Sequence, residues 1–154
     1  INKNIAILLF NMIEKVLHKK KLFALIVRKQ FRKKSGINFF TDNSATQQFG
    51  YMKHKKNYLI KPHLHNKRQS KILSTSEVII LLKGILRVDF YDNKENYVFS
   101  KKVYANDIIM LINGGHGFKV IKDIEMIEVK QGPYNLMEDK KKFNKIDEKK
   151  IKIK

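Results

Sequence analysis

The sequence predicts a mainly β protein, a small barrel or sandwich preceded by an α-helical extension. From Gly50 onward, short apolar runs are separated by turn residues at the close spacing typical of such folds. The residues before Gly50 instead place their apolar side chains at helical spacing. A length of 154 residues fits one domain with extensions.

Two helices are expected in the N-terminal part. Apolar residues within 5–16 recur at the i, i+3, i+4 spacing of one helical face. A second helix is expected from Leu22 to about Phe31, flanked by basic residues and ended by Ser35 and Gly36. We expect both helices to pack on their own domain, and binding to a membrane surface is the alternative.

The barrel is expected to contain eight strands. The segment 91–97, YDNKENY, should connect two of them as a hairpin, because Asp92 and Asn93 tolerate left-handed backbone. The run VIILL at 78–82 is apolar on both faces, so one face should line the barrel and a helix or a second subunit should cover the other. The predicted strands are 48–54, 57–63, 77–83, 85–91, 96–104, 107–112, 117–121 and 125–130.

Alternation indicates that the strand at 85–91 is half-buried. Its apolar positions are Leu86, Val88 and Phe90, and its polar positions are Arg87, Asp89 and Tyr91. The C-terminal residues are highly charged and have no sustained period, which predicts a frayed helix or disorder. The predicted division is a helical extension at 1–37, a barrel domain at 38–136 and a charged tail at 137–154.

The formal net charge is +19, and residues 1–40 carry ten Lys/Arg against Glu14 alone. Two explanations stay open, a nucleic-acid or membrane partner and a genome rich in lysine codons. We predict no specific nucleic-acid partner. The apolar run 5–10 is far shorter than the roughly 20 residues of a membrane span, and no signal peptide is recognisable. We therefore expect a cytoplasmic protein, and Ile1 in place of Met is compatible with a fragment or a processed product.

Metal-binding residue types are concentrated in two places. There is no cysteine, so histidine and carboxylates are the strong ligands available. His63 and His65 would project from the same face of a strand, and Glu77 begins the next long strand. His116 is flanked by glycines, which permit backbone geometry that other residues resist. These four side chains predict one site, and surface or packing histidines are the alternative.

Three imidazoles and one carboxylate suit a divalent transition metal, namely Fe, Mn, Ni, Co, Cu or Zn. Ligand identity does not choose among these metals. An open coordination position would remain for water or for a small-molecule ligand. Lys67 and Arg68, in the connection beyond the histidines, and Arg87 and Tyr91, on a strand, are candidate substrate-binding residues.

The motif PHLH-(x)11-E-(x)6-G, followed by NDIIMLINGGHGF, resembles the two conserved motifs of the cupin superfamily. The resemblance covers about residues 38 to 135. Within the superfamily, the chain is similar to a group of small bacterial cupins, some of them encoded near genes for polysaccharide and sugar synthesis. Three features depart from the pattern: the eleven-residue connection from His65 to Glu77, Asn106 in place of a glycine, and the missing PxG. The resemblance implies a jelly-roll barrel, the four metal ligands above and a homodimer.

Two classes of function follow from the resemblance. The first is a metal-dependent enzyme, of isomerase or epimerase type, acting on a small polar or sugar-derived substrate in polysaccharide biosynthesis; an Fe(II)-dependent dioxygenase is a variant of it. The second is a non-catalytic module that binds a metal or small ligand, because a shared fold does not establish catalysis.

Overall fold

The computed structural model describes residues 12–135 and 139–154. They form two compact units. The first unit contains the described residues up to Phe31 together with Thr75–Lys154, and the second unit is Arg32–Ser74. The described residues contain β-strands and one short 3₁₀ helix, and none of them forms an α-helix.

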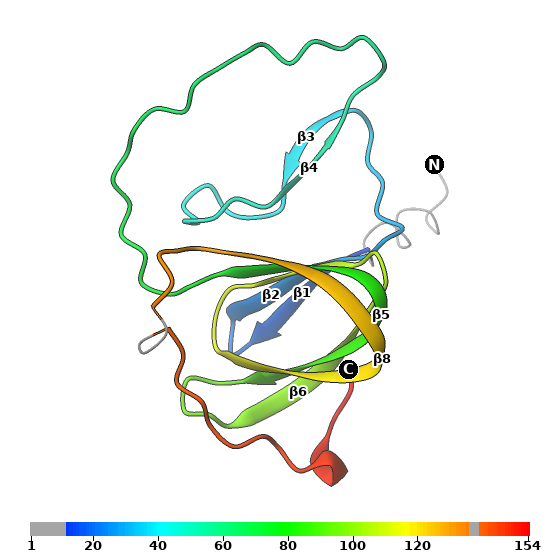
Figure 1. Cartoon of the computed structure of the whole chain (residues 1–154), viewed down its shortest axis with the longest axis vertical. Helices are drawn as coiled ribbons and strands as arrows, with labels where there is room; N and C mark the ends of the chain where they lie inside the picture. Colours follow the sequence, from blue (N-terminus) through cyan, green and yellow to red (C-terminus); the bar gives the residue numbers. More distant parts are fainter. Residues whose placement is uncertain (1–11, 136–138) are drawn as a thin grey trace. The chain divides into compact units, whose positions relative to one another are not determined.

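The first unit is one curled antiparallel sheet in the form of a half-barrel. Its strand order is β1-β2-β7-β5-β6, and β8 pairs with β5. Figure 1 shows β5 and β8 as two long, strongly bent strands that run side by side. The strands are β1 (Ile13–His18), β2 (Lys21–Val27), β5 (Glu77–Tyr91), β6 (Tyr97–Tyr104), β7 (Ile108–Leu111) and β8 (Gly115–Lys130).

The curl of the sheet comes from a bend in the middle of β5. The first half of β5, from Glu77 to Ile80, pairs with β7, and the second half, from Ile85 onward, pairs with β6. Gly84 lies between the halves with φ at +85°, and the register with β8 shifts on both sides of it. This left-handed geometry is favourable only for glycine, so Gly84 allows one strand to serve both sides of the core.

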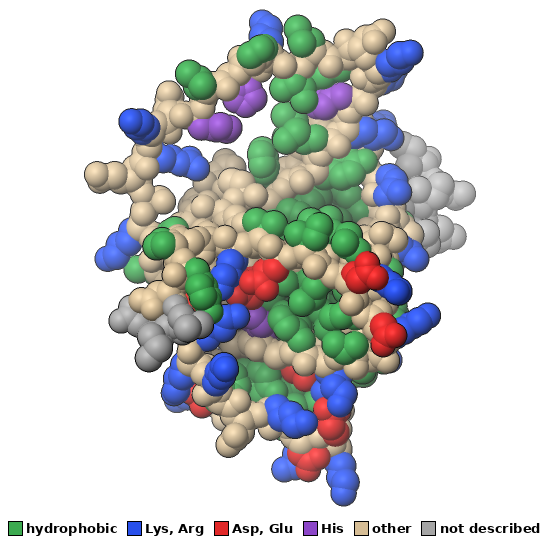
Figure 2. Space-filling view, in the orientation of Figure 1, with side chains coloured by type: hydrophobic (Ala, Val, Ile, Leu, Met, Phe, Trp, Pro, Cys, Tyr) green, Lys and Arg blue, Asp and Glu red, His purple; other side chains and the backbone are tan. Residues whose placement is uncertain are grey.

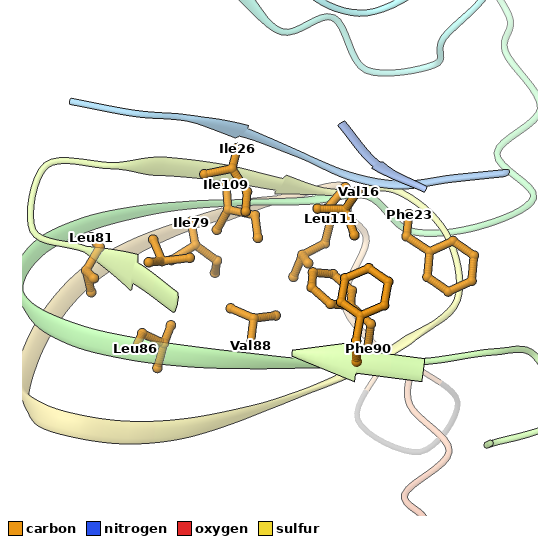
Figure 3. Packing of buried hydrophobic residues seen from close by; sticks show 13 residues of the cluster. Val16, Phe23, Ile26, Ile79, Leu81, Leu86, Val88, Phe90, Ile109 and Leu111 are labelled. Atoms are coloured by element: carbon orange, nitrogen blue, oxygen red, sulfur yellow. The ribbon is translucent and has the colours of Figure 1, made fainter. Parts of the chain in front are cut away.

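The core lies inside the curl. Leu86, Val88 and Phe90, from the second half of β5, point toward side chains of the first half and of β7 and β2, among them Ile79 and Ile109 (Figure 3). All five of these side chains are at most 1% exposed. The alternation at 85–91 therefore separates the core-facing side chains from the others, but the expectation of a half-buried strand is wrong, because its polar side is buried as well.

The structure corrects the prediction of N-terminal helices. Residues 13–16 of the first predicted helix belong to β1, and residues 22–27 of the second belong to β2; residues 5–11 lie outside the described part of the chain. The stretch 23–27, FALIV, is buried at every position between β1 and β7. An apolar run of this length satisfies helical spacing as well as a strand buried on both faces, so periodicity alone could not separate them.

Most of the strands predicted after Gly50 are present. The predicted pairs 77–83 with 85–91 and 117–121 with 125–130 are each one continuous strand. The hairpin at 91–97 is confirmed, but the residue with left-handed backbone is Glu95 (φ 66°). The carboxylate of Asp92 accepts hydrogen bonds from the backbone N–H groups of Lys94 and Asn96, both at 2.9 Å, which shapes the turn from its first residue.

The outer face of the β5–β8 pair is apolar along the first half of β5. Val78 and Ile80 are half-buried there, and Leu82 is exposed. Their neighbours on β8, Ile127 and Val129, are each about half exposed. No N-terminal helix covers this face among the described residues, and the predicted homodimer stays a prediction.

The second unit is a two-stranded antiparallel sheet with a long irregular segment. Its strands are β3 (Gly36–Phe39) and β4 (Gly50–Lys53). The sequence predicted β4 within 48–54, but the strand predicted at 57–63 is absent. Residues 55–75 are exposed. No described residue belongs to a helix long and apolar enough to cross a membrane.

The C-terminal tail corrects a second prediction, because its residues 139–154 pack on the first unit. The backbone of Ser100 on β6 donates to Lys152 O at 2.8 Å and accepts from Lys154 N at 3.0 Å. The carboxylate of Glu148, at the start of the 3₁₀ helix Glu148–Lys150, binds the guanidinium of Arg87 at 2.7 and 3.0 Å. The carboxylate of Glu148 in the tail therefore neutralises the buried guanidinium of Arg87. The composition of the tail alone could not predict this contact.

Docking of the tail is expected to weaken in acid. Hydrogen bonds from Arg87 lower the pKa of Glu148 from 4.5 to about 2. Because the folded-state pKa is depressed, the ion pair stabilises docking fully above pH 4.5 and loses this contribution as the pH falls toward 2. We expect the protection of the Ser100 amide against hydrogen exchange, measured relative to the intrinsic rate at each pH, to fall across this window, so that exchange becomes faster than a docked tail allows. Glu148→Gln should show the faster exchange already at neutral pH, whereas Glu125→Gln, in an exposed pair with Lys83, should leave the profile unchanged. Equal profiles in Glu148→Gln and the parent would contradict this origin.

Candidate functional site

Glu77 is positioned by the start of β5. It pairs in register with Leu111 of β7 and with Lys130 of β8, so strands hold it on both sides. Just before it, the backbone N–H of Ser76 donates to the side-chain oxygen of Gln131 at 3.1 Å. Glu77 is only 8% exposed, and carboxylates are rarely buried to this extent unless they are paired.

His116 is positioned by β8 and by the turn before it. It lies opposite Phe90 in register, so its side chain points to the core side of the sheet. Gly114 has φ at +75°, and a Cβ there would lie 2.6 Å from the carbonyl oxygen of Tyr91 and 2.7 Å from the Phe23 ring. A close approach at the turn therefore requires the glycine that precedes this histidine in the sequence.

Glu77 and His116 form a contact inside the half-barrel. The Glu77 Oε2 and His116 Nε2 atoms are 3.0 Å apart, and the two side chains are 11% and 28% exposed. The hydrogen bond from His116 lowers the pKa of Glu77 against the opposing effect of burial, and the charges of His116, Lys140 and Lys130 act in the same direction as the hydrogen bond. The site therefore presents an ionised carboxylate beside an imidazole nitrogen, both of which can bind a metal or exchange a proton.

His63 and His65 lie near each other in the second unit. Their ring centroids are 5.3 Å apart with an interplanar angle of 76°. The Nδ1 atom of His63 lies 2.9 Å from the carbonyl oxygen of Lys61, and both histidines are exposed. The four predicted ligands thus occur as two pairs, each within its own unit.

Among the side chains that the structure describes, no three His, Cys, Asp or Glu residues come close enough together to hold a metal ion. The pairing of Glu77 with His116 is consistent with the sequence-based grouping of these two residues. A four-ligand centre stays a prediction.

The predicted substrate-binding residues occupy two different settings. Lys67 and Arg68 are exposed in the irregular segment of the second unit. Arg87 binds Asp89 and Glu148, and the hydroxyl of Tyr91 accepts a hydrogen bond from the backbone N–H of Ile146 at 3.1 Å. Arg87 and Tyr91 therefore contact the C-terminal tail. They lie on the sheet face opposite to the one that carries the side chain of His116.

Sequence reasoning missed two neighbours of the Glu77–His116 pair. The Phe118 ring lies 5.3 Å from the imidazole of His116. Lys130 pairs in register with Glu77, while its ammonium group binds Asp139 at 2.8 Å. The i, i+2 relation of His116 to Phe118 was readable from the sequence, but the register of Lys130 depends on the bulges of β8 and was not.

No protein family, curated protein or solved structure matches this chain. Its first unit has a mainly β architecture, a curled antiparallel half-barrel. The resemblance to cupins rests on the sequence motifs around His63, His65, Glu77 and His116.

Proposed function

We propose that this chain is a metal-binding protein of the cupin type. Glu77 and His116 would bind one divalent transition metal together with His63 and His65. The metal would serve an enzyme of isomerase or epimerase type acting on a small polar or sugar-derived substrate, and an Fe(II) dioxygenase and a non-catalytic binding module are the competing functions.

The observation that carries the proposal is the contact between Glu77 and His116. Two residues far apart in the chain bring a carboxylate oxygen and an imidazole nitrogen to 3.0 Å, on the inner side of a half-barrel. Both are donors that transition metals accept, and the carboxylate is kept ionised, as a ligand must be. His63 and His65 would supply two more imidazoles, whose ring centroids are 5.3 Å apart. We assign them to the same metal centre because of the HxH motif.

The chain's own residues have separable roles in this proposal. Glu77 orients the ring of His116 through the 3.0 Å contact between its Oε2 atom and His116 Nε2. The Phe118 ring, 5.3 Å from the imidazole of His116, would border the bound metal on one side. When bound, the metal would supply Lewis acidity toward a carbonyl or hydroxyl oxygen.

The proposal is tested by metal content and affinity. We expect the purified protein to contain a transition metal by elemental analysis and to give a saturable absorption change with Co(II). Glu77→Gln and His116→Ala should each weaken Co(II) binding by about 10- to 100-fold or more. This is the usual effect of losing an outer-sphere partner, and loss of a ligand should cost at least as much. His63→Ala and His65→Ala should weaken it likewise.

The matched controls are His18→Ala and His54→Ala, which remove histidines outside the proposed centre and should leave Co(II) binding unchanged. If these controls weaken binding as much as His116→Ala does, the histidines bind metal only as surface groups. A parent protein that binds no transition metal would refute the proposal. Turnover of a sugar-derived substrate, oxygen uptake with Fe(II), or neither would then separate the three functions.

A further inference from the structure

A hollow that does not include Glu77 or His116 lies in the first unit, where three turns meet. It is a solvent-open hollow of about 420 Å³, a volume within the range of small-molecule sites. The β1–β2 turn, the β5–β6 turn and the β7–β8 turn supply its walls. The lining residues are His18, Lys19, Lys21, Phe23, Asp92, Asn93, Lys94, Asn96 and Asn113.

The hollow is electropositive. Lys19, Lys21 and Lys94 come from two different turns and are all exposed. The one acid in the lining is Asp92, whose carboxylate already accepts hydrogen bonds from Lys94 N, Asn96 N and Asn96 Nδ2. These bonds keep the carboxylate ionised, so it offsets the charge of one of the three lysines. The other two positive charges favour an anion that enters the hollow.

The walls of the hollow are fixed by contacts within the fold. The side-chain amide of Asn113 donates to the carbonyl oxygen of Leu22 at 2.9 Å, which joins the β7–β8 turn to β2. The ring of His18 packs edge-on against the nearly buried ring of Phe23, with centroids 5.6 Å apart. A ligand would therefore meet a preformed wall with an aromatic part and a polar amide part.

We infer that this hollow binds a small molecule that carries a phosphate monoester. Lysine ammonium groups are compact point charges suited to a phosphate dianion, and three of them border one hollow. A nucleic acid is less favoured, because it needs an extended basic stripe, whereas Lys and Arg side chains are scattered over the face shown in Figure 2. The inference does not depend on the proposed metal centre, since it uses none of the same residues.

The test uses phenyl phosphate and inorganic phosphate, followed by amide chemical shifts of the full chain. We expect saturable shifts confined to residues 18–21, 92–96 and 112–114, with phenyl phosphate binding more tightly than inorganic phosphate. The triple variant Lys19→Gln, Lys21→Gln, Lys94→Gln should weaken phenyl phosphate binding about tenfold or more. The matched control Lys122→Gln, Lys142→Gln, Lys149→Gln removes the same charge from exposed positions elsewhere in the first unit and should change binding less than about twofold.

Three results would overturn the inference. The first is equal weakening by both triple variants, which would mean attraction to the overall charge. The second is the absence of saturable shifts, or shifts spread over the surface lysines. The third is a response to vesicles containing phosphatidic acid without one to phenyl phosphate, which would assign the site to a lipid headgroup instead of a free small molecule.

Discussion

Replacing Gly84 by alanine is expected to lower the free energy of unfolding by about 3 kcal/mol. The backbone at Gly84 has φ at +85°, which an L-residue adopts at a cost of about 1–2 kcal/mol. A Cβ would also approach the carbonyl oxygens of Lys122, at 2.5 Å, and of Asp123. Both obstacles are backbone atoms of β8, so relief requires the β5–β8 ladder to move.

Gly117→Ala is the matched control, because Gly117 belongs to the same ladder. It has no left-handed φ, and the nearest atom to an added Cβ there is a ring carbon of Tyr91 at an ordinary 3.8 Å. Chemical denaturation should show a loss for Gly84→Ala and little change for Gly117→Ala. Similar midpoints for the two variants would show that the bend at Gly84 tolerates a side chain, and that the curl of the sheet does not depend on glycine there.

Gly84 also shows what motif spacing could and could not predict. The E-(x)6-G spacing placed a carboxylate and a glycine on one strand, and the structure puts Glu77 at the strand start and Gly84 at the bend. Asn106 occupies the place of a glycine in the second motif, and its φ of 70° shows that asparagine can adopt the required backbone there. In both cases, local backbone chemistry was readable from residue type.

The relation between distant segments was much less readable. The same-face rule for HxH agrees with the proximity of the His63 and His65 rings, although residues 57–63 form no strand. The pairing partner of a strand depends on register and on non-local contacts that a single sequence does not display. For this reason Glu77 could be grouped with His116 from motif knowledge, whereas the register of Lys130 was missed.

Covering of the outer sheet face was the other unpredictable feature. Arg87, Asp89 and Tyr91 form the polar side of an alternating strand, and such a side normally faces water. They are nevertheless at most 6% exposed, because the tail packs over them. Alternation gives the direction of a side chain, but it does not show what covers that side chain.

The burial of Arg87 leads to the second large expected effect. Arg87→Met should lower the free energy of unfolding by about 3–5 kcal/mol, the usual cost of leaving a buried charge without its partner. The guanidinium binds Asp89 at 2.8 and 3.0 Å, and Asp89 is only 5% exposed. After the substitution, Asp89 would keep the hydroxyl of Ser100 as a donor but would lose its counter-charge.

The double variant Arg87→Met, Asp89→Val separates charge from packing. Replacing both partners removes the unpaired carboxylate, so we expect it to recover much of the stability that Arg87→Met loses. Glu148→Gln should cost far less than Arg87→Met at neutral pH. The side chain of Glu148 is 44% exposed, so water already screens its carboxylate, and Arg87 keeps Asp89 as its partner. The measurement is chemical denaturation of all three variants with the parent. If the double variant is as unstable as Arg87→Met, the loss reflects packing of the long arginine side chain instead of the stranded charge of Asp89.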